Sequence, residues 1–120
     1  MASQVQDFSS NAETLKMPAY CLFDVREIKD REKLADYRSK VFATVEQYGG
    51  RYRVLGGAFT VVEGDWSPVI PVIIEFPSLA RMHEWYGSAE YAPLKGLRMA
   101  GAACHAVFMD GFAPEVTSGS

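Results

Sequence analysis

The fold is decided by one stretch, which starts at Tyr48-Gly49-Gly50-Arg51-Tyr52, continues through Glu63-Gly64-Asp65-Trp66 and ends at Ile73-Ile74-Glu75-Phe76-Pro77-Ser78. It contains two glycine pairs, a tryptophan in a polar segment and a carboxylate inside an apolar strand pattern. Helical patterns flank the stretch on both sides, and each of them needs a surface to pack on. The stretch therefore predicts a sheet that both helical regions cover.

A strand is predicted before this stretch, from Ala19 to Glu27. Its residues alternate between two faces, and Cys21, Phe23 and Val25 form an apolar face that should meet the helices. The opposite face is mixed and suits a ligand cavity or a partner surface; it carries Tyr20, Leu22, Asp24 and Arg26.

A long amphipathic helix is predicted next. Asp30 is suited to the N-cap, and Glu32 places a negative charge in the first turn, where the helix dipole favours it. Apolar residues follow at spacings of three and four and form one stripe, made of Leu34, Tyr37, Val41, Val45 and Tyr48. Gly49-Gly50 should end the helix, because glycine adopts the left-handed conformation easily.

The second half predicts more strands and helices. Gly56-Gly57 suits a two-residue hairpin turn between strands from Arg51 to Leu55 and from Ala58 to Glu63. A loop with Trp66 then leads to a buried strand from Val72 to Phe76. The remaining expected elements are a helix capped by Ser78, a short helix capped by Ser88 and a last strand from Ala103 to Asp110.

This order predicts an α+β fold, a ferredoxin-like βαββαβ antiparallel sheet with helices on one face. The folded domain should span residues 18–112, between a flexible N-terminal arm at 1–17 and a flexible C-terminal tail at 113–120. The uncovered sheet face would carry Tyr20, Leu22 and Ile73, so two sheets are expected to pair face to face in a homodimer.

Composition narrows the class of protein. A chain of 120 residues with net charge −3 and no concentrated group of Lys and Arg is a poor nucleic-acid binder. It has neither a stretch long enough to span a membrane nor a secretory signal, so no membrane partner is expected. The two cysteines, Cys21 and Cys104, are expected to be buried free thiols, which favours a cytoplasmic location.

The combined motifs resemble a family of unknown function within the dimeric α/β-barrel superfamily. The matching segments are Tyr48-Gly49-Gly50-Arg51-Tyr52, Gly56-Gly57, Glu63-Gly64-Asp65-Trp66-Ser67-Pro68, Ile74-Glu75-Phe76-Pro77-Ser78, Trp85-Tyr86-Gly87-Ser88-Ala89-Glu90-Tyr91 and Leu97-Arg98. The resemblance covers about residues 18–112 and implies the fold and the homodimer. It implies no particular reaction.

The chain departs from this family at two positions. The resemblance would lead us to expect arginine where the chain has Leu55 and Ile70. If those arginines bind an anionic group, this chain would take a less charged ligand. Arg53 is expected on the same strand face as Leu55, where it would partly substitute.

Three residues are candidates for catalysis. Glu75 lies in an apolar strand, where a carboxylate is costly unless it is paired, so it is either a general base or a structural partner of Arg53 or a backbone N–H. His105 is a candidate for proton transfer, with a core histidine as the alternative, and His83 is expected on the surface. Arg53 would stabilise negative charge that develops on the substrate during the reaction. The two histidines cannot form a metal triad, and no metal or cofactor is expected.

Six further residues are candidates for substrate binding: Asp24, Tyr20, Trp66, Trp85, Tyr86 and Tyr91. Aromatic walls are typical of small-molecule pockets, although aromatic residues at helical spacing, such as Trp85, are also typical of a core. Asp24 either orients a ligand hydroxyl or pairs with Arg26 or Arg53. Trp66 is either a cavity lid or a contact to the partner chain.

Two functions are therefore expected from the sequence. Because isomerase, lyase, cyclase and monooxygenase chemistry recurs in the superfamily that the chain resembles, one is a cofactor-independent enzyme acting on a small ring- or carbonyl-containing compound. The other is a dimeric binding or stress-accessory protein without turnover, in which the polar residues form structural ion pairs.

Overall fold

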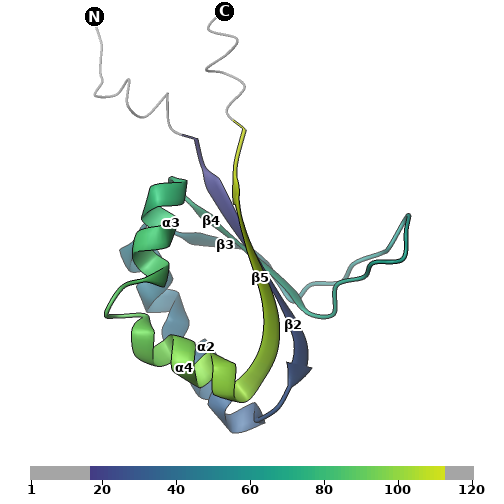
Figure 1. Cartoon of the computed structure of the whole chain (residues 1–120), viewed down its shortest axis with the longest axis horizontal. Helices are drawn as coiled ribbons and strands as arrows, with labels where there is room; N and C mark the ends of the chain where they lie inside the picture. The colour runs from purple at the N-terminus through teal and green to yellow at the C-terminus, as the bar shows by residue number, and fades with distance from the viewer. Residues whose placement is uncertain (1–16, 113–120) are drawn as a thin grey trace, which may run out of the picture.

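The computed structural model describes residues 17–112, which form a sheet and the helices packed on it (Figure 1). The elements follow in the order β2 (Ala19–Ile28), α2 (Arg31–Gln47), β3 (Arg51–Leu55), β4 (Pro71–Phe76), α3 (Leu79–Tyr86), α4 (Ala92–Gly101) and β5 (Ala102–Asp110). The predicted arm and tail lie outside the described residues, apart from Met17. No helix among residues 17–112 is long and apolar enough to cross a membrane.

The sheet has four strands in the order β3-β4-β2-β5, and every neighbouring pair is antiparallel. Figure 1 shows α2, α3 and α4 on one side of this sheet, while its other side carries no helix among the described residues. This arrangement confirms the predicted α+β, ferredoxin-like fold. We call the two sides of the sheet the helix face and the open face.

Strand β2 has the predicted alternation. Cys21, Phe23 and Val25 are buried on the helix face. They pair in register with Phe108, Ala106 and Cys104 of β5, which therefore lie on the same face. Tyr20, Leu22 and Arg26 alternate with them and are only half-buried. The side that meets the helices was thus readable from the sequence.

Helix α2 also begins and ends as predicted. A carboxylate oxygen of Asp30 accepts hydrogen bonds from the backbone N–H groups of Glu32 and Lys33, both at 3.1 Å. The helix buries four of the five expected residues, Leu34, Tyr37, Val41 and Val45, together with Thr44. The fifth, Tyr48, follows the helix and is only half-buried. Gly49 follows in the left-handed conformation with φ of 83°, which ends the helix and turns the chain into β3.

The predicted hairpin strand from Ala58 to Glu63 is wrong. The structure has no regular element between Leu55 and Pro71, and β3 pairs with β4 instead. The backbone N–H of Gly56 donates to the carbonyl of Pro71 at 2.7 Å. This hydrogen bond joins the residue that follows β3 to the first residue of β4. Between them, residues 57–69 form a projecting loop that extends away from the helices (Figure 1).

Two serines precede the later helices. The hydroxyl of Ser78 accepts a hydrogen bond from the backbone N–H of Arg81 at 3.1 Å and caps α3 as predicted. Ser88 does not cap α4, which begins at Ala92 without a side-chain cap. Its hydroxyl instead accepts from the N–H of Tyr91 at 3.1 Å and fixes the turn before that helix.

The core lies between the helices and the helix face. Trp85 is completely buried, and its indole N–H donates to the hydroxyl of Thr44 on α2 at 3.0 Å. At the other end of the core, Gly101 brings the end of α4 against the start of α2. Its carbonyl accepts hydrogen bonds from the N–H groups of Lys29 and Asp30 at 2.8 and 3.0 Å. These contacts hold the end of α4 close to the start of α2.

Candidate functional site between helix α2 and the sheet

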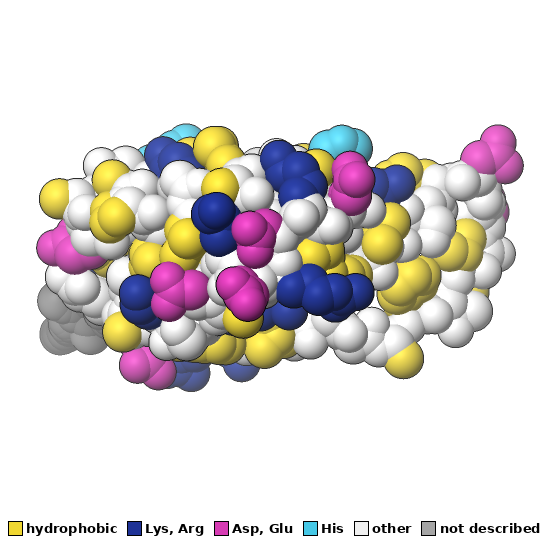
Figure 2. All heavy atoms as spheres, turned by 90° about the horizontal axis from the view of Figure 1, so that it is seen from below, with side chains coloured by type: hydrophobic (Ala, Val, Ile, Leu, Met, Phe, Trp, Pro, Cys, Tyr) yellow, Lys and Arg dark blue, Asp and Glu magenta, His cyan; other side chains and the backbone are white. Residues whose placement is uncertain are grey.

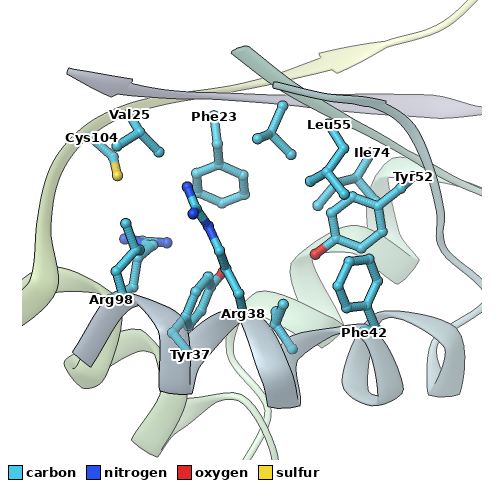
Figure 3. Close-up of a pocket in the computed structure, with 13 residues that line it drawn as sticks. Phe23, Val25, Tyr37, Arg38, Phe42, Tyr52, Leu55, Ile74, Arg98 and Cys104 are labelled. Atoms are coloured by element: carbon cyan, nitrogen blue, oxygen red, sulfur yellow. The ribbon is translucent and has the colours of Figure 1, made fainter. Parts of the chain in front are cut away.

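An inner cavity of about 50 Å³ lies between α2 and the helix face of the sheet (Figure 3). It is lined by Phe23, Val25, Leu34, Tyr37, Arg38, Val41, Phe42, Tyr52, Leu55, Val72, Ile74, Arg98 and Cys104. Beside it lies an outer hollow of about 490 Å³, whose walls include Ile28, Gly56 and Ile70. The two spaces share Arg38, Phe42, Leu55 and Val72, so the inner cavity borders the outer hollow at these side chains.

Apolar and aromatic side chains form most of the walls. Phe23 comes from β2, Tyr37 and Phe42 from α2, and Tyr52 from β3. The rings of Phe42 and Tyr52 lie with their centroids 4.5 Å apart on one side of the cavity. Because Phe42 is exposed at the surface, its ring can move without disturbing the core. The cavity is therefore bounded on this side by an exposed side chain.

Arg98 is the most unusual residue of the lining. It belongs to the buried side of α4 together with Leu94 and Gly101, and only 6% of it is exposed. Its Nη1 donates to the hydroxyl of Tyr91 at 2.8 Å, and its guanidinium carbon lies 4.9 Å from the centre of the Phe23 ring. Its Nε is buried without a hydrogen-bond partner, and no carboxylate among residues 17–112 forms an ion pair with it.

The hydroxyl groups near Arg98 are neutral. Tyr91 and Tyr37 hydrogen-bond to each other through their hydroxyls at 3.1 Å. Burial is the main cause that raises the pKa of Tyr37 to about 12, and burial also raises the pKa of Tyr91. Neither tyrosine is therefore ionised at physiological pH. The Arg98 guanidinium, which stays charged, has polar neighbours but no counter-charge in the described part of the chain.

Arg38 brings a second positive charge to the cavity. It projects from α2 into the cavity in Figure 3 and lines both the inner cavity and the outer hollow. The lining contains no aspartate, glutamate or histidine. Cys104 is half-buried in the wall, and desolvation raises the pKa of its thiol, which keeps it protonated. Two guanidinium groups in a largely apolar space make the cavity attractive to an anion.

The predicted pair of Glu75 and Arg53 forms on the other side of the sheet. Arg53 Nε donates to Glu75 Oε1 at 2.7 Å, and both side chains remain partly exposed. Together with Arg51 they line a polar groove of about 350 Å³. A bulge between Tyr52 and Val54 shifts the strand register. Leu55 consequently lies in the cavity lining, not beside Arg53, so the prediction that they share a face is wrong.

His105 does not meet Glu75 within one chain. His105 pairs with Asp24 of β2, whereas Glu75 pairs with Tyr20, four residues earlier on that strand. This offset alone separates the two by about 13 Å. His105 is exposed and lies on the open face, and neither residue lines the inner cavity. Their catalytic roles remain predictions, and one chain does not bring them to one reacting atom.

Glu75→Gln is expected to lower the free energy of unfolding by less than about 1 kcal/mol, because the partly exposed ion pair with Arg53 contributes little. Urea unfolding of wild type and variant measures the difference. A much larger loss would contradict this and assign Glu75 a strong structural role. Val54→Ala is the control. It changes an uncharged residue on the same strand pair and measures how much any side-chain truncation there lowers the stability.

Asp24 has a structural role that its burial explains. It is only 2% exposed, and its Oδ1 accepts hydrogen bonds from the N–H groups of Val69 and Ile70 at 2.9 and 3.0 Å. Its Oδ2 accepts from Arg26 at 2.5 Å, as one of the two predicted pairings. Desolvation acts to raise the pKa of Asp24, but the hydrogen bonds from Arg26 and the backbone outweigh it and lower the pKa. Asp24 therefore fastens the base of the projecting loop to β2.

The five aromatic candidates are spread over the molecule. Trp85 and Tyr91 are completely buried in the core, and Tyr86 lies half-buried beneath Lys95, whose Nζ is 3.9 Å from its ring centre. Tyr20 lies on the open face, and Trp66 is 60% exposed in the projecting loop. None of them lines the inner cavity. Only Tyr91 reaches it, through its hydrogen bond to Arg98.

Sequence reasoning missed the residues that do form the cavity, above all Arg98. A signal was present, because Tyr91, Leu94 and Arg98 follow one another at spacings of three and four. An arginine on the apolar stripe of a helix is unusual and indicates a buried charge. The positions where the resemblance would place arginine, Leu55 and Ile70, both line the outer hollow, whose wall is therefore apolar at these points.

The two cysteines, Cys21 and Cys104, are free thiols in the structure. Cys21 is buried, and desolvation raises its pKa to about 12. In the part of the chain that the structure describes, no group of three or more His, Cys, Asp or Glu side chains is placed to hold a metal ion.

Comparisons with known proteins agree with this fold. The chain is similar to the crystal structure of the RPA0582 protein of unknown function from Rhodopseudomonas palustris, with a TM-score of 0.65 and 18% sequence identity over 91% of this chain and 95% of that chain. The structure of methylated RPA0582 protein is similar too, with a TM-score of 0.65 and 17% identity over 92% of this chain and 94% of that chain. No curated protein matches the chain. Residues 18–112 match the family described as Domain of unknown function (DUF1330), and the chain therefore belongs to this family.

Proposed function

We propose that this protein binds a small organic molecule in the space between α2 and the sheet. The observation that carries the proposal is the inner cavity, which is apolar, aromatic and adjacent to a larger hollow at the surface. Small-molecule sites typically have this character and occupy roughly 300–1,000 Å³. The inner cavity alone is smaller, so a ligand would displace the exposed Phe42 and Arg38 and extend into the outer hollow.

Binding is favoured over catalysis by the chemistry of the lining. General acid–base catalysis mostly relies on histidine or carboxylate side chains within hydrogen-bond reach of the substrate. The lining contains neither, and its polar groups are guanidinium, phenol and thiol groups. Isomerase, lyase, cyclase or monooxygenase chemistry would have to use these groups. The binding function needs only the shape and the charge of the space.

Val72→Phe is expected to abolish binding of a small aromatic probe, because Val72 lies where the inner cavity and the outer hollow meet. Benzamide is a suitable probe, and the shifts of backbone amide signals in ¹H–¹⁵N spectra measure its binding. Val62→Phe, the same change at a position that is 90% exposed in the projecting loop, should bind as wild type does. If the shifts in wild type spare the residues around the cavity, the proposed site is wrong.

We propose in addition that the protein forms a homodimer through the open face. The open face carries half-buried Tyr20, Leu22 and Ile73 and exposed Val107 and Met109, which is more apolar surface than a strand face in water usually shows. A twofold dimer covers the same patch on both chains. The projecting loop adds exposed hydrophobic side chains at one end, and Figure 2 shows them together on the right, away from the mixed charges of the helical part.

Val107→Lys is expected to dissociate the dimer, because it places a charge in the centre of the buried patch without affecting the monomer, where Val107 is 49% exposed. Sedimentation velocity at micromolar concentration measures the mass. Ala43→Lys, on the exposed side of α2, is the matched control and should leave the mass unchanged. A wild-type protein that sediments with the mass of one chain would remove the dimer proposal.

A further inference from the structure

We propose that the ligand of the inner cavity is a small carboxylate with an apolar, ring-sized body, and that Arg98 binds its carboxylate group. This inference rests on the proposed function and names the chemical class of the molecule that it binds. It starts from the energetics of Arg98, which is buried without an ion pair in the described part of the chain.

A buried guanidinium without a counter-charge is costly, because desolvation of an ion costs several kcal/mol unless an opposite charge and hydrogen bonds offset it. In this chain the offset is incomplete. Tyr91 supplies a neutral acceptor for Nη1 and the Phe23 ring a cation–π contact, but Nε keeps no partner among the described residues. An unsatisfied buried polar group in a folded protein calls for an explanation, and a bound anion is one. A ligand anion would supply both the missing counter-charge and an acceptor for Nε.

The geometry of Arg98 suits a carboxylate in particular. Tyr91 holds the guanidinium from one side through Nη1, which leaves the side that carries Nε for a ligand. A guanidinium binds a carboxylate through two parallel N–H donors, and this arrangement is stronger than a neutral hydrogen bond. The Tyr37 hydroxyl lines the same cavity and is neutral, so it can donate to a carboxylate oxygen. Arg38 adds a second positive charge on the side of the outer hollow.

The remaining lining defines the body of the ligand. Apart from the two arginines, the Tyr37 hydroxyl and the Cys104 thiol, the walls are aromatic and aliphatic, and Arg98 is the one buried charge among the lining residues. A second anionic group on the ligand would have to lie near Arg38, in the outer hollow. Figure 3 shows Arg98 and the rings of Phe23 and Tyr52 around one space, so the ligand that we propose has a flat or branched apolar body next to one carboxylate.

The test compares two probes of almost equal shape, benzoate and benzamide, by isothermal titration and by ¹H–¹⁵N spectra. We expect wild type to bind benzoate at least roughly 10-fold more tightly than benzamide, since a charge-assisted pair is worth more than a neutral one. Arg98→Met should remove this preference, so that the variant binds benzoate no more tightly than benzamide. Arg98→Lys, which keeps the charge but not the paired donors, should retain a smaller preference.

Each result has a distinct meaning. If wild type binds both probes equally, or if Arg98→Met keeps the preference for benzoate, the inference is wrong while the binding function stands. If neither probe shifts residues around the cavity, the proposed function itself fails, and this inference with it. Thermal unfolding supplies a second readout: Arg98→Met should melt no lower than wild type, because Tyr91 and Tyr37 still hydrogen-bond to each other. A clear fall in melting temperature would instead assign Arg98 a structural role.

Discussion

Asp24→Ala is expected to lower the free energy of unfolding by about 3 kcal/mol. The change removes the acceptor of the two N–H groups of Val69 and Ile70 and leaves Arg26 without its carboxylate. Because these groups lie at the base of the projecting loop, the loop should detach from β2 and become accessible to protease before the rest of the chain unfolds. Urea unfolding and limited proteolysis measure the two effects.

The control is Asp36→Ala, which removes an exposed carboxylate that pairs with Lys40 at 3.1 Å on α2. This loss should stay below about 1 kcal/mol, because exposed pairs contribute little. Equal losses for the two variants would contradict the structural role of Asp24. Asp24→Asn should lie between them, since the amide oxygen still accepts from the backbone but no longer pairs with Arg26.

The stabilising effect of Asp24 should also depend on pH. The pKa of Asp24 in the folded protein lies below its ordinary value of 3.8, so its ionised form stabilises the fold above that pH. This contribution disappears as the pH falls through the lowered pKa. The difference in stability between wild type and Asp24→Asn should therefore be constant above about pH 5 and shrink below pH 3.8. A difference that grows toward acid would contradict the direction of the shift.

Gly101→Ala is expected to lower the free energy of unfolding by about 2 to 3 kcal/mol. A β-carbon at this position would lie 2.8 Å from the backbone nitrogen of Leu34 and 3.2 Å from the carbonyl oxygen of Asp30. Backbone atoms cannot turn aside as a flexible side chain can, so α4 would have to move away from α2. Chemical denaturation measures the loss, and the same movement should displace Arg98 and weaken benzoate binding.

Gly96 provides a matched control within the same helix. A β-carbon there has nothing within 4 Å, so Gly96→Ala should raise the free energy of unfolding by about 0.5 to 1 kcal/mol through the better helix propensity of alanine. Opposite signs for the two Gly→Ala changes would establish that contact, not propensity, decides the effect at Gly101. A similar gain at both positions would show that the helices are not held as closely as described.

Much of the fold could be predicted because the apolar residues recur at the spacing typical of a strand or of a helix. The alternation around Phe23 and the stripe around Val41 each record which side is buried, and the caps at Asp30 and Ser78 mark where helices begin. The error over residues 58–63 has the opposite cause. Phe59 and Val61 alternate with smaller or polar residues as in a strand, but a strand also needs hydrogen bonds to a neighbour. Residues 58–63 pair with no strand in the described part of the chain, and the edge strand β3 pairs with β4 alone.

The candidate site was harder to predict, since it depends on which face a residue takes and on what lies opposite. The apolar neighbours of Glu75 make it conspicuous in the sequence, yet its own side chain lies on the open face beside Arg53. Arg98 escapes sequence reasoning because arginines are usually exposed, and the packing of α4 against α2 and the sheet removes it from water. Periodicity indicates burial, but it does not reveal that a buried charge lacks a partner.

Cys104 places a free thiol in the wall of the cavity. Of the two cysteines in the chain, Cys21 is completely buried in the core, whereas Cys104 is half-buried in the cavity wall that it shares with Arg98. Disulfide exchange needs the thiolate, and desolvation raises the pKa of this thiol, so Cys104 should react slowly with a small disulfide at neutral pH and faster as the pH rises. A molecule that fills the cavity would cover this sulfur, so the rate at which Cys104 exchanges with a small disulfide reports whether the cavity is occupied.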